Sequence, residues 1–279
     1  MKLRVGISTC PNDTYAFHAL LERRVHVDGV ELDFVLSDVE ELNQGLGEGR
    51  FDVAKASCHA ALLHAQQYAL LRSGAAIGYG VGPLLLAREA QRQPKRGDRV
   101  LCPGALTTAT LLFRSLHPDL EAPEHCVFSA IQPALREGRA DFGVVIHEGR
   151  FTYQDAGLHL VADLGELWEE RTGAPLPLGG ILVRKQLGAG LHRALHRALQ
   201  ASIDYAASHR DEALTSMRRY AQEHSDPVLW KHVELYVTEE TRALSRSAEL
   251  ALRSLAEAAK AAGVISSFLS PLELAPVGA

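Results

Sequence analysis

The chain has 279 residues, 47% of them hydrophobic and 23% charged, which is enough to bury a sizeable core in one large or two smaller units. Its formal net charge of -5 and pI of about 6.2 provide no field that attracts a polyanion, so we expect no nucleic-acid partner. The sequence shows neither an apolar run of about 20 residues nor a secretory-type leader, which favours a cytoplasmic protein with no membrane partner.

The cysteines and histidines do not have the spacing of a metal site. No CxxC or HxxxH pattern occurs, and the adjacent Cys and His residues at 58–59 and 125–126 cannot easily chelate one ion. We therefore expect no metal. In a cytosolic chain the four cysteines are predicted to be reduced thiols: Cys10, Cys58, Cys102 and Cys126.

Strand-like runs alternate with amphipathic helical stretches through the first two thirds of the chain, which predicts an α/β fold with largely parallel strands. The first strand is expected over Leu3–Ser8, and the helix after it begins with Asn12 or Asp13 as N-cap and continues to about residues 21–24. The next elements are a strand over 31–36, a helix over 39–48 ended by Gly49, and a strand over 51–56.

The glycine-rich stretch 73–83 is typical of a segment that leads into a hinge, and it precedes an apolar run over 84–87. The polar segment 88–99 is expected to be exposed. A second strand and helix series then runs from Val100 to about Pro177, and only helices are predicted after Leu191. The helical tail includes helices over 191–208 and 243–262, the second with Gly263 as its left-handed C-terminal cap.

Two such series predict two lobes, the first built from residues 1–88 and 183–279 and the second from residues 89–182. The chain would then cross between the lobes twice, with hinges near Arg88 and Arg184 and a central cleft between the lobes. We expect a small anionic substrate to bind there, because ligands of parallel α/β sheets sit beyond the carboxyl ends of the strands. Polar segments follow predicted strands at 8–13, which includes the candidate ligand Asn12, and at 55–57, 104–108 and 147–150.

His147 is the best single candidate for a general base. It follows the buried-looking strand over 142–146, so its imidazole is expected at the ligand edge. An unperturbed pKa of about 6.5 leaves a neutral, proton-accepting fraction at physiological pH without any metal. The alternative is a histidine that serves only packing or the surface, as most of the 13 histidines must.

Thr107 and Thr108 follow a Pro-Gly turn at the start of a predicted helix, which suits an anion cradle of backbone N-H groups and hydroxyls. The alternative is that one threonine merely caps the helix. Lys55 and Ser57 alternate on one strand, and either could bind a substrate oxyanion; their alternatives are an exposed strand end and a turn cap. A Ser57 nucleophile is disfavoured because no GxSxG elbow surrounds it, and the GxGxG run at 78–82 is followed by no helix to bind a dinucleotide.

Five segments together resemble the 1,4-dihydroxy-6-naphthoate synthase family of the futalosine route to menaquinone. They are Ser-Thr-Cys-Pro-Asn-Asp-Thr at 8–14, Asp-Val-Ala-Lys-Ala-Ser at 52–57, the Ser-Gly-Ala-Ala and Gly-Val-Gly-Pro-Leu motifs at 73–76 and 80–84, His-Glu-Gly-Arg-Phe-Thr-Tyr at 147–153, and Pro-Leu-Gly-Gly at 177–180. Their order spans about two thirds of the chain, and the helical tail carries little of the signature.

The resemblance implies a two-lobed periplasmic-binding-protein-like fold of type II, used for catalysis on cyclic dehypoxanthinyl futalosine without a cofactor. By the same resemblance, His147 is the proton acceptor, and Lys55, Ala56, Ser57, Thr107 and Thr108 line the substrate site. Two rival functions share this fold. One is a binding protein that captures a small anion without transforming it, and the other is the sister chorismate dehydratase of the same route.

Overall fold

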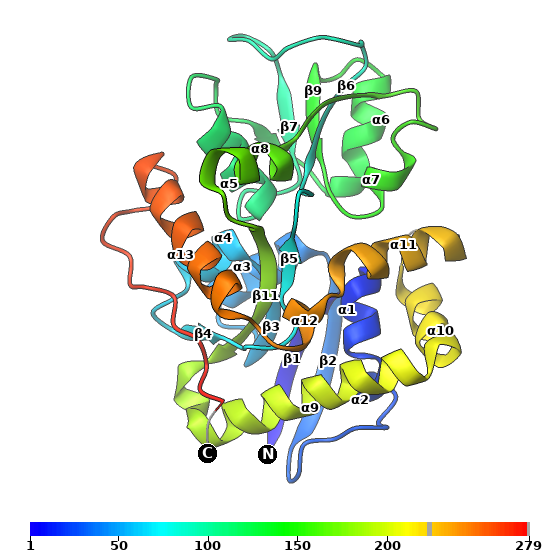
Figure 1. The fold of residues 1–279 in the computed structure, drawn as a ribbon, viewed down its shortest axis with the longest axis vertical. Helices are drawn as coiled ribbons and strands as arrows, with labels where there is room; N and C mark the ends of the chain where they lie inside the picture. Colours follow the sequence, from blue (N-terminus) through cyan, green and yellow to red (C-terminus); the bar gives the residue numbers. More distant parts are fainter. Residues whose placement is uncertain (222–224, 278–279) are drawn as a thin grey trace. The chain divides into compact units, whose positions relative to one another are not determined.

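The computed structural model describes residues 1–221 and 225–277, which form two compact units (Figure 1). Unit 1 comprises Met1–Ile77, Gly179–Arg246 and Leu269–Ala279, and unit 2 comprises Gly78–Leu178 and Ser247–Phe268. The chain therefore passes between the units four times, after residues 77, 178, 246 and 268, where the sequence-based division has two crossings. The strand over 84–87 belongs with unit 2 because it pairs with two strands of that unit's sheet.

Unit 1 is built on a mixed sheet. The strands lie in the order β2 (Glu31–Ser37), β1 (Lys2–Ser8), β3 (Val53–Ser57), β11 (Leu176–Arg184) and β4 (Tyr68–Leu70), and β5 (Ala76–Gly78) also pairs with β11. β1 runs parallel to β2 and β3, but β11 runs antiparallel to β3 and β4. The prediction of largely parallel strands was therefore wrong, because β11 returns against β3. The carboxyl ends of β1 and β3 still meet at one edge, as parallel neighbours must.

Helices cover this sheet and bury its apolar side chains. The core cluster joins Val5 of β1 and Val53 of β3 to Leu199 and Ile203 of the long helix α9. Figure 1 shows α9 beside the short helix α2, which it also contacts. The helices of unit 1 are α1 (Pro11–Ala16), α2 (His18–Leu21), α3 (Val39–Gly47), α4 (Cys58–Leu63), α9 (Gly188–Ser208), α10 (Arg210–Tyr220), α11 (Asp226–Tyr236) and α12 (Glu239–Arg242).

The first helix starts differently from the prediction. Cys10 occupies the N-cap position of α1 and makes no side-chain cap, and Pro11 provides the first helical residue. Proline suits this position because its missing N-H would have no helical partner. Asp13 is therefore not the cap; it lies in the first turn, where its carboxylate binds other side chains. The expected single helix to residues 21–24 is two short ones that meet at Phe17.

Unit 2 also contains a mixed sheet, in the order β10 (His159–Asp163), β6 (Leu84–Ala87), β9 (Phe142–Val145), β7 (Val100–Cys102) and β8 (Glu124–His125). β7 is parallel to β8 and β9, whereas β6 is antiparallel to β9 and β10. Its helices are α5 (Thr108–Leu116), α6 (Ile131–Arg136), α7 (Gly149–Thr152), α8 (Leu164–Thr172) and α13 (Arg246–Ala261). Two single 3-10 turns, Phe128–Ala130 and Lys185–Leu187, complete the described elements.

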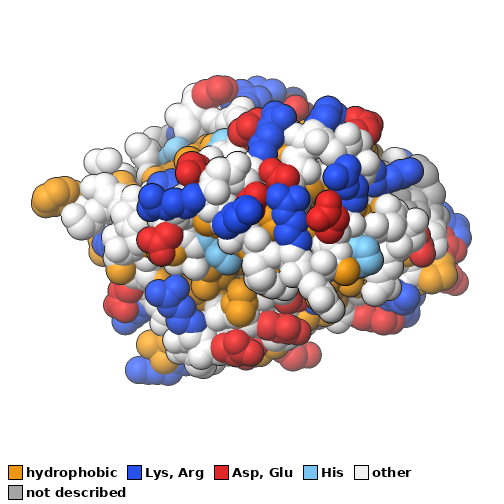
Figure 2. All heavy atoms as spheres, turned by 90° about the horizontal axis from the view of Figure 1, so that it is seen from above, with side chains coloured by type: hydrophobic (Ala, Val, Ile, Leu, Met, Phe, Trp, Pro, Cys, Tyr) orange, Lys and Arg blue, Asp and Glu red, His pale blue; other side chains and the backbone are white. Residues whose placement is uncertain are grey.

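Several local predictions are confirmed. Gly263 follows α13 with φ +65°, the left-handed conformation expected of a C-terminal cap, and residues 88–99 are mostly exposed. Acidic and basic side chains are intermixed on the face seen in Figure 2. Among residues 1–221 and 225–277, no helix is both long and apolar enough to span a bilayer.

Candidate functional site

A buried ion pair joins the carboxyl ends of β1 and β3 in unit 1. Lys55 Nζ contacts Asp13 Oδ1, and the two residues are only 7% and 2% exposed. The second carboxylate oxygen accepts a 2.6 Å hydrogen bond from the hydroxyl of Ser8, the last residue of β1. Charges this deeply buried are stable only when they are paired and hydrogen-bonded. Because Asp13 balances the charge of Lys55, the pair carries no net charge, and Lys55 is not the exposed strand end of the alternative interpretation.

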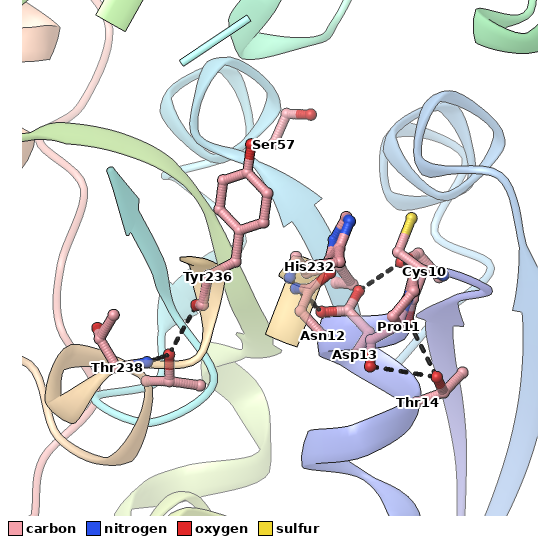
Figure 3. Close-up of polar contacts among 12 residues, drawn as sticks. Cys10, Pro11, Asn12, Asp13, Thr14, Ser57, His232, Tyr236 and Thr238 are labelled. Carbon is pink, nitrogen blue, oxygen red and sulfur yellow. Dashed lines mark hydrogen bonds and ion pairs between the residues drawn. The ribbon is translucent and has the colours of Figure 1, made fainter. Parts of the chain in front are cut away.

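Asn12 extends this network toward the helical tail (Figure 3). Its Nδ2 donates to Asp13 Oδ1 at 2.9 Å, and its Oδ1 lies 3.0 Å from Nε2 of His232 on α11. Because the amide nitrogen faces the carboxylate, the amide oxygen must face His232, so the ring nitrogen is the donor of that bond. His232 is fully buried beside Tyr236, with ring centroids 4.8 Å apart. The orientation of the Asn12 amide is therefore held by its neighbour Asp13 and by His232, which lies 220 residues away in the sequence.

Ser57 ends β3 and stands at the N-cap position of α4, yet its side chain makes no cap. It is held by Asn43 of α3, which is completely buried. Asn43 Oδ1 accepts from the Ser57 backbone N-H at 3.0 Å, and Asn43 Nδ2 donates to Ser57 Oγ at 3.2 Å. The turn-cap alternative for Ser57 is therefore wrong.

Ala56 contributes backbone rather than side chain, because it is fully buried between neighbouring strands. Gly179 of β11 lies opposite Ser57, and a Cβ there would come within 2.6 Å of the Ala56 carbonyl oxygen. The Pro-Leu-Gly-Gly motif thus has a packing reason: only glycine allows β11 to approach the end of β3 this closely.

In unit 2, Thr107 and Thr108 lie beyond the end of β7. Thr107 caps α5, since its hydroxyl oxygen accepts from Thr110 N at 3.2 Å, and the same hydroxyl donates to Gly104 O at 3.0 Å. The Thr108 hydroxyl donates to Leu178 O at 2.6 Å. The Thr108 proton is thus directed at a backbone carbonyl, and the Thr107 hydroxyl has two acceptors, Gly104 O and Thr110 Oγ1. The helical-cap alternative is confirmed for Thr107. An anion at this helix start would contact mainly backbone N-H groups.

His147 lies two residues beyond the end of β9 and is half-buried. Its backbone adopts φ +55°, a left-handed conformation that few non-glycine residues take and that clusters at functional sites. The imidazole packs edge-on against Phe128, with ring centroids 4.9 Å apart. Because of this turn, the His147 side chain does not continue the alternation of β9, and α7 begins two residues later.

Arg150 anchors the short helix that follows His147. Its Nη1 lies 2.6 Å from Asp163 Oδ2 and donates to the carbonyl oxygen of Gly82 at 2.7 Å. Asp163 ends β10 and is 3% exposed; its other oxygen caps α8 through Gly165 N. Arg150 therefore joins α7 to β10 and to the glycine-rich segment, which fixes the backbone that carries His147.

The structure brings Asn12 and Lys55 together through Asp13 and gives Ser57 its own clamp, all within unit 1. Thr107, Thr108 and His147 all belong to unit 2. The sequence analysis missed Asn43, His232 and Asp163, because no local motif marks a residue whose partner lies on another element.

Two of the buried cysteines, Cys58 and Cys102, are not activated. Burial raises the pKa of Cys58 to about 12 and that of Cys102 to about 12, so both thiols stay protonated near neutral pH. Within the described part of the chain, no three His, Cys, Asp or Glu side chains are grouped to hold a metal ion.

Comparison with known proteins identifies the family. Residues 3–261 match the family model described as menaquinone biosynthesis. The chain belongs to this menaquinone biosynthesis family. Two curated members carry the name 1,4-dihydroxy-6-naphthoate synthase. The protein from Thermus thermophilus is 46% identical over 97% of this chain and 98% of its own length, and that from Streptomyces coelicolor is 40% identical over 94% of each.

Solved structures place this family member in a fold class. A protein from Archaeoglobus fulgidus superposes with a TM-score of 0.90 at 32% identity, covering 95% of this chain and 98% of that one. A Candida albicans protein described as having the generic periplasmic-binding-protein fold gives 0.67 at 12% identity, covering 96% and 92%. The predicted periplasmic-binding-protein-like fold is confirmed, whereas the predicted cleft between its lobes stays a prediction.

Proposed function

We propose that this chain is a 1,4-dihydroxy-6-naphthoate synthase, a carbon-carbon lyase that converts cyclic dehypoxanthinyl futalosine to 1,4-dihydroxy-6-naphthoate in the cytoplasm. The observation that carries this proposal is the near full-length identity to two curated synthases, at 46% and 40%. The family match over residues 3–261, described as menaquinone biosynthesis, agrees with this proposal.

In the proposed reaction, His147 acts as the general base. Removal of one proton from the substrate starts cleavage of a carbon-carbon bond and loss of the ribose-derived part, and the aromaticity gained in the product provides the driving force. The strained backbone of His147 and the Arg150 anchor support this role, because a base must be held in one orientation to act efficiently.

The proposed substrate contacts are groups at strand ends and at a helix start. Asn12, Lys55, Ala56 and Ser57 present amide, ammonium, backbone and hydroxyl groups at the ends of β1 and β3. The helix start at Thr107 and Thr108 presents backbone N-H groups that favour an anionic oxygen. These groups are hydrogen-bond donors or balanced charges, which suits a carboxylated substrate with many oxygen atoms. No cofactor is required for this chemistry.

The two rival functions are less well supported. An anion-binding protein of this fold would bind the substrate without turnover, and a chorismate dehydratase would release water from chorismate. Neither name appears among the near full-length curated relatives, which are both synthases.

The test is to incubate the purified protein with cyclic dehypoxanthinyl futalosine and to follow the naphthoate by absorbance and mass spectrometry. The proposal predicts stoichiometric product at a rate proportional to enzyme concentration. A parallel incubation with chorismate should leave it unchanged. Tight binding of the futalosine derivative without any product would favour the binding protein, and loss of water from chorismate would favour the dehydratase.

A further inference from the structure

Asn43 on α3 fixes the direction of the hydrogen bonds at Ser57, and this direction follows from the backbone alone. The Ser57 backbone N-H can only donate, so the Asn43 atom that faces it at 3.0 Å must be the amide oxygen. The amide nitrogen then faces Ser57 Oγ at 3.2 Å and donates to it. Ser57 Oγ is therefore an acceptor in this contact, and its own proton must point to a different acceptor.

The remaining contacts of Asn43 keep the amide from rotating. Its Nδ2 also donates to Glu40 Oε2 at 3.3 Å, one turn earlier on α3, so both amide hydrogens are engaged. Asn43 is completely buried and Ser57 is nearly so, and exchanging the two amide atoms would place N-H against N-H. At the same time the clamp keeps Ser57 from capping α4, the usual use of a serine in this position.

We propose that Asn43 is a positioning residue that holds Ser57 as a hydrogen-bond donor toward an acceptor oxygen of the anionic substrate. This proposal rests on the function proposed above, in which Ser57 contacts the substrate. It goes further by assigning specificity: the end of β3 binds a substrate oxygen that accepts a hydrogen bond, and it disfavours a substrate group that donates one. Asn43 itself need not touch the substrate.

The decisive substitution is Asn43→Asp, made together with Glu40→Gln so that the new carboxylate does not face the carboxylate of Glu40; it keeps the shape of the side chain but replaces its donor with an acceptor. A carboxylate there still accepts from the Ser57 backbone, but it also captures the Ser57 hydroxyl proton. We expect KM to rise about tenfold with kcat changed less than about twofold, the effect of one lost hydrogen bond to a charged group. Ser57→Ala should raise KM similarly. Gln44→Glu, an exposed neighbour on α3, adds the same charge and should leave KM unchanged.

The double variant separates positioning from simple charge repulsion. If Asn43 acts through the Ser57 hydroxyl, Asn43→Asp should add almost nothing in the Ser57→Ala background, whereas repulsion would persist there. Asn43→Ala, which introduces no ionisable group, should raise KM about threefold and lose that effect in the same background. If the effects of the single substitutions on KM multiply in the double variants, the proposal is overturned. An unchanged KM in both Asn43 variants would overturn it as well.

Binding of 1,4-dihydroxy-6-naphthoate, measured by calorimetry, gives a readout that does not need turnover. The same pattern of coupling should appear in its Kd. If the wild-type protein binds the naphthoate with this coupling but forms no product, the proposed function fails while the role of Asn43 stands. If product forms and the coupling is absent, the role of Asn43 fails while the function stands.

Discussion

Lys55 and Asp13 form an ion pair that is almost completely shielded from water, at the edge where β1 and β3 end. Ser8 and Asn12 complete the shell around the carboxylate with hydrogen bonds of 2.6 and 2.9 Å. The pair thus links the first helix of the chain to the strand that carries Ser57.

Asp13→Asn should destabilise the protein strongly, because it leaves a buried ammonium without its counter-ion. We expect a loss of about 3 to 5 kcal/mol in the free energy of unfolding, measured by urea denaturation. Adding Lys55→Met should recover part of this loss. The matched control is Asp226→Asn, which breaks the surface pair with Arg218 and should change stability little. Equal losses in the two single variants would contradict the account of the buried pair.

Arg150→Lys should lower kcat by roughly tenfold while KM changes little. Lysine keeps the charge, but its side chain is shorter, so its ammonium cannot reach the position of Nη1, which contacts both Asp163 and Gly82 O; α7 and His147 then lose their fixed position. Steady-state kinetics measure the effect, and Arg139→Lys, on an exposed part of unit 2, is the control. A rise in KM at constant kcat would mean that Arg150 contacts the substrate instead.

Replacing Thr107 and Thr108 together by Val should raise KM and lower stability, because their hydroxyls bind backbone carbonyls as well as shaping the helix start. The double replacement by Ser keeps both hydroxyls and should retain most of the affinity. Kinetics and thermal denaturation of the two variants separate the roles. If the Val variant loses stability but its KM is unchanged, the anion does not bind at this helix start.

Acid should destabilise the fold partly through His117. Burial lowers the pKa of this imidazole, and its Nε2 has no hydrogen-bond partner within the described residues. The unfolded chain therefore takes up a proton near pH 6.5 that the folded chain resists, so stability present above this pH is lost as pH falls.

His117→Phe, which preserves the ring contact with Phe113, should reduce the drop in melting temperature between about pH 7.5 and 5.5. His159→Phe, at an exposed site in the same unit, should leave that drop unchanged. If the melting temperature falls by the same amount between these pH values in the His117 variant and in the wild type, His117 does not contribute to the acid destabilisation.

Much of the architecture was predictable because it depends on local signals. The alternation of strands and helices, the Gly263 cap and the exposed segment 88–99 each follow from a few adjacent residues. The antiparallel return of β11 was not, since strand direction depends on a partner more than 100 residues away. The first helix was misassigned at its start because Asp13 has better partners than a helix N-terminus, namely Lys55 and Ser8.

The candidate site was predictable only in part for the same reason. Strand-end position marked His147, Lys55 and Ser57, but the residues that orient them lie on other elements. Asn43 and His232 sit on amphipathic helices where nothing local distinguishes them from other buried polar residues. The two threonines illustrate the opposite case, because a capping residue and an anion ligand share one sequence signal.

The most direct test of the central claim compares the wild-type protein with His147→Asn on cyclic dehypoxanthinyl futalosine, with no metal or cofactor added. We predict that the wild type forms 1,4-dihydroxy-6-naphthoate and that the variant, folded to the same melting temperature, forms it at least about 100-fold more slowly while still binding the naphthoate. Near-normal turnover by the variant would contradict the role of His147, and no product from the wild-type protein would contradict the proposed function itself.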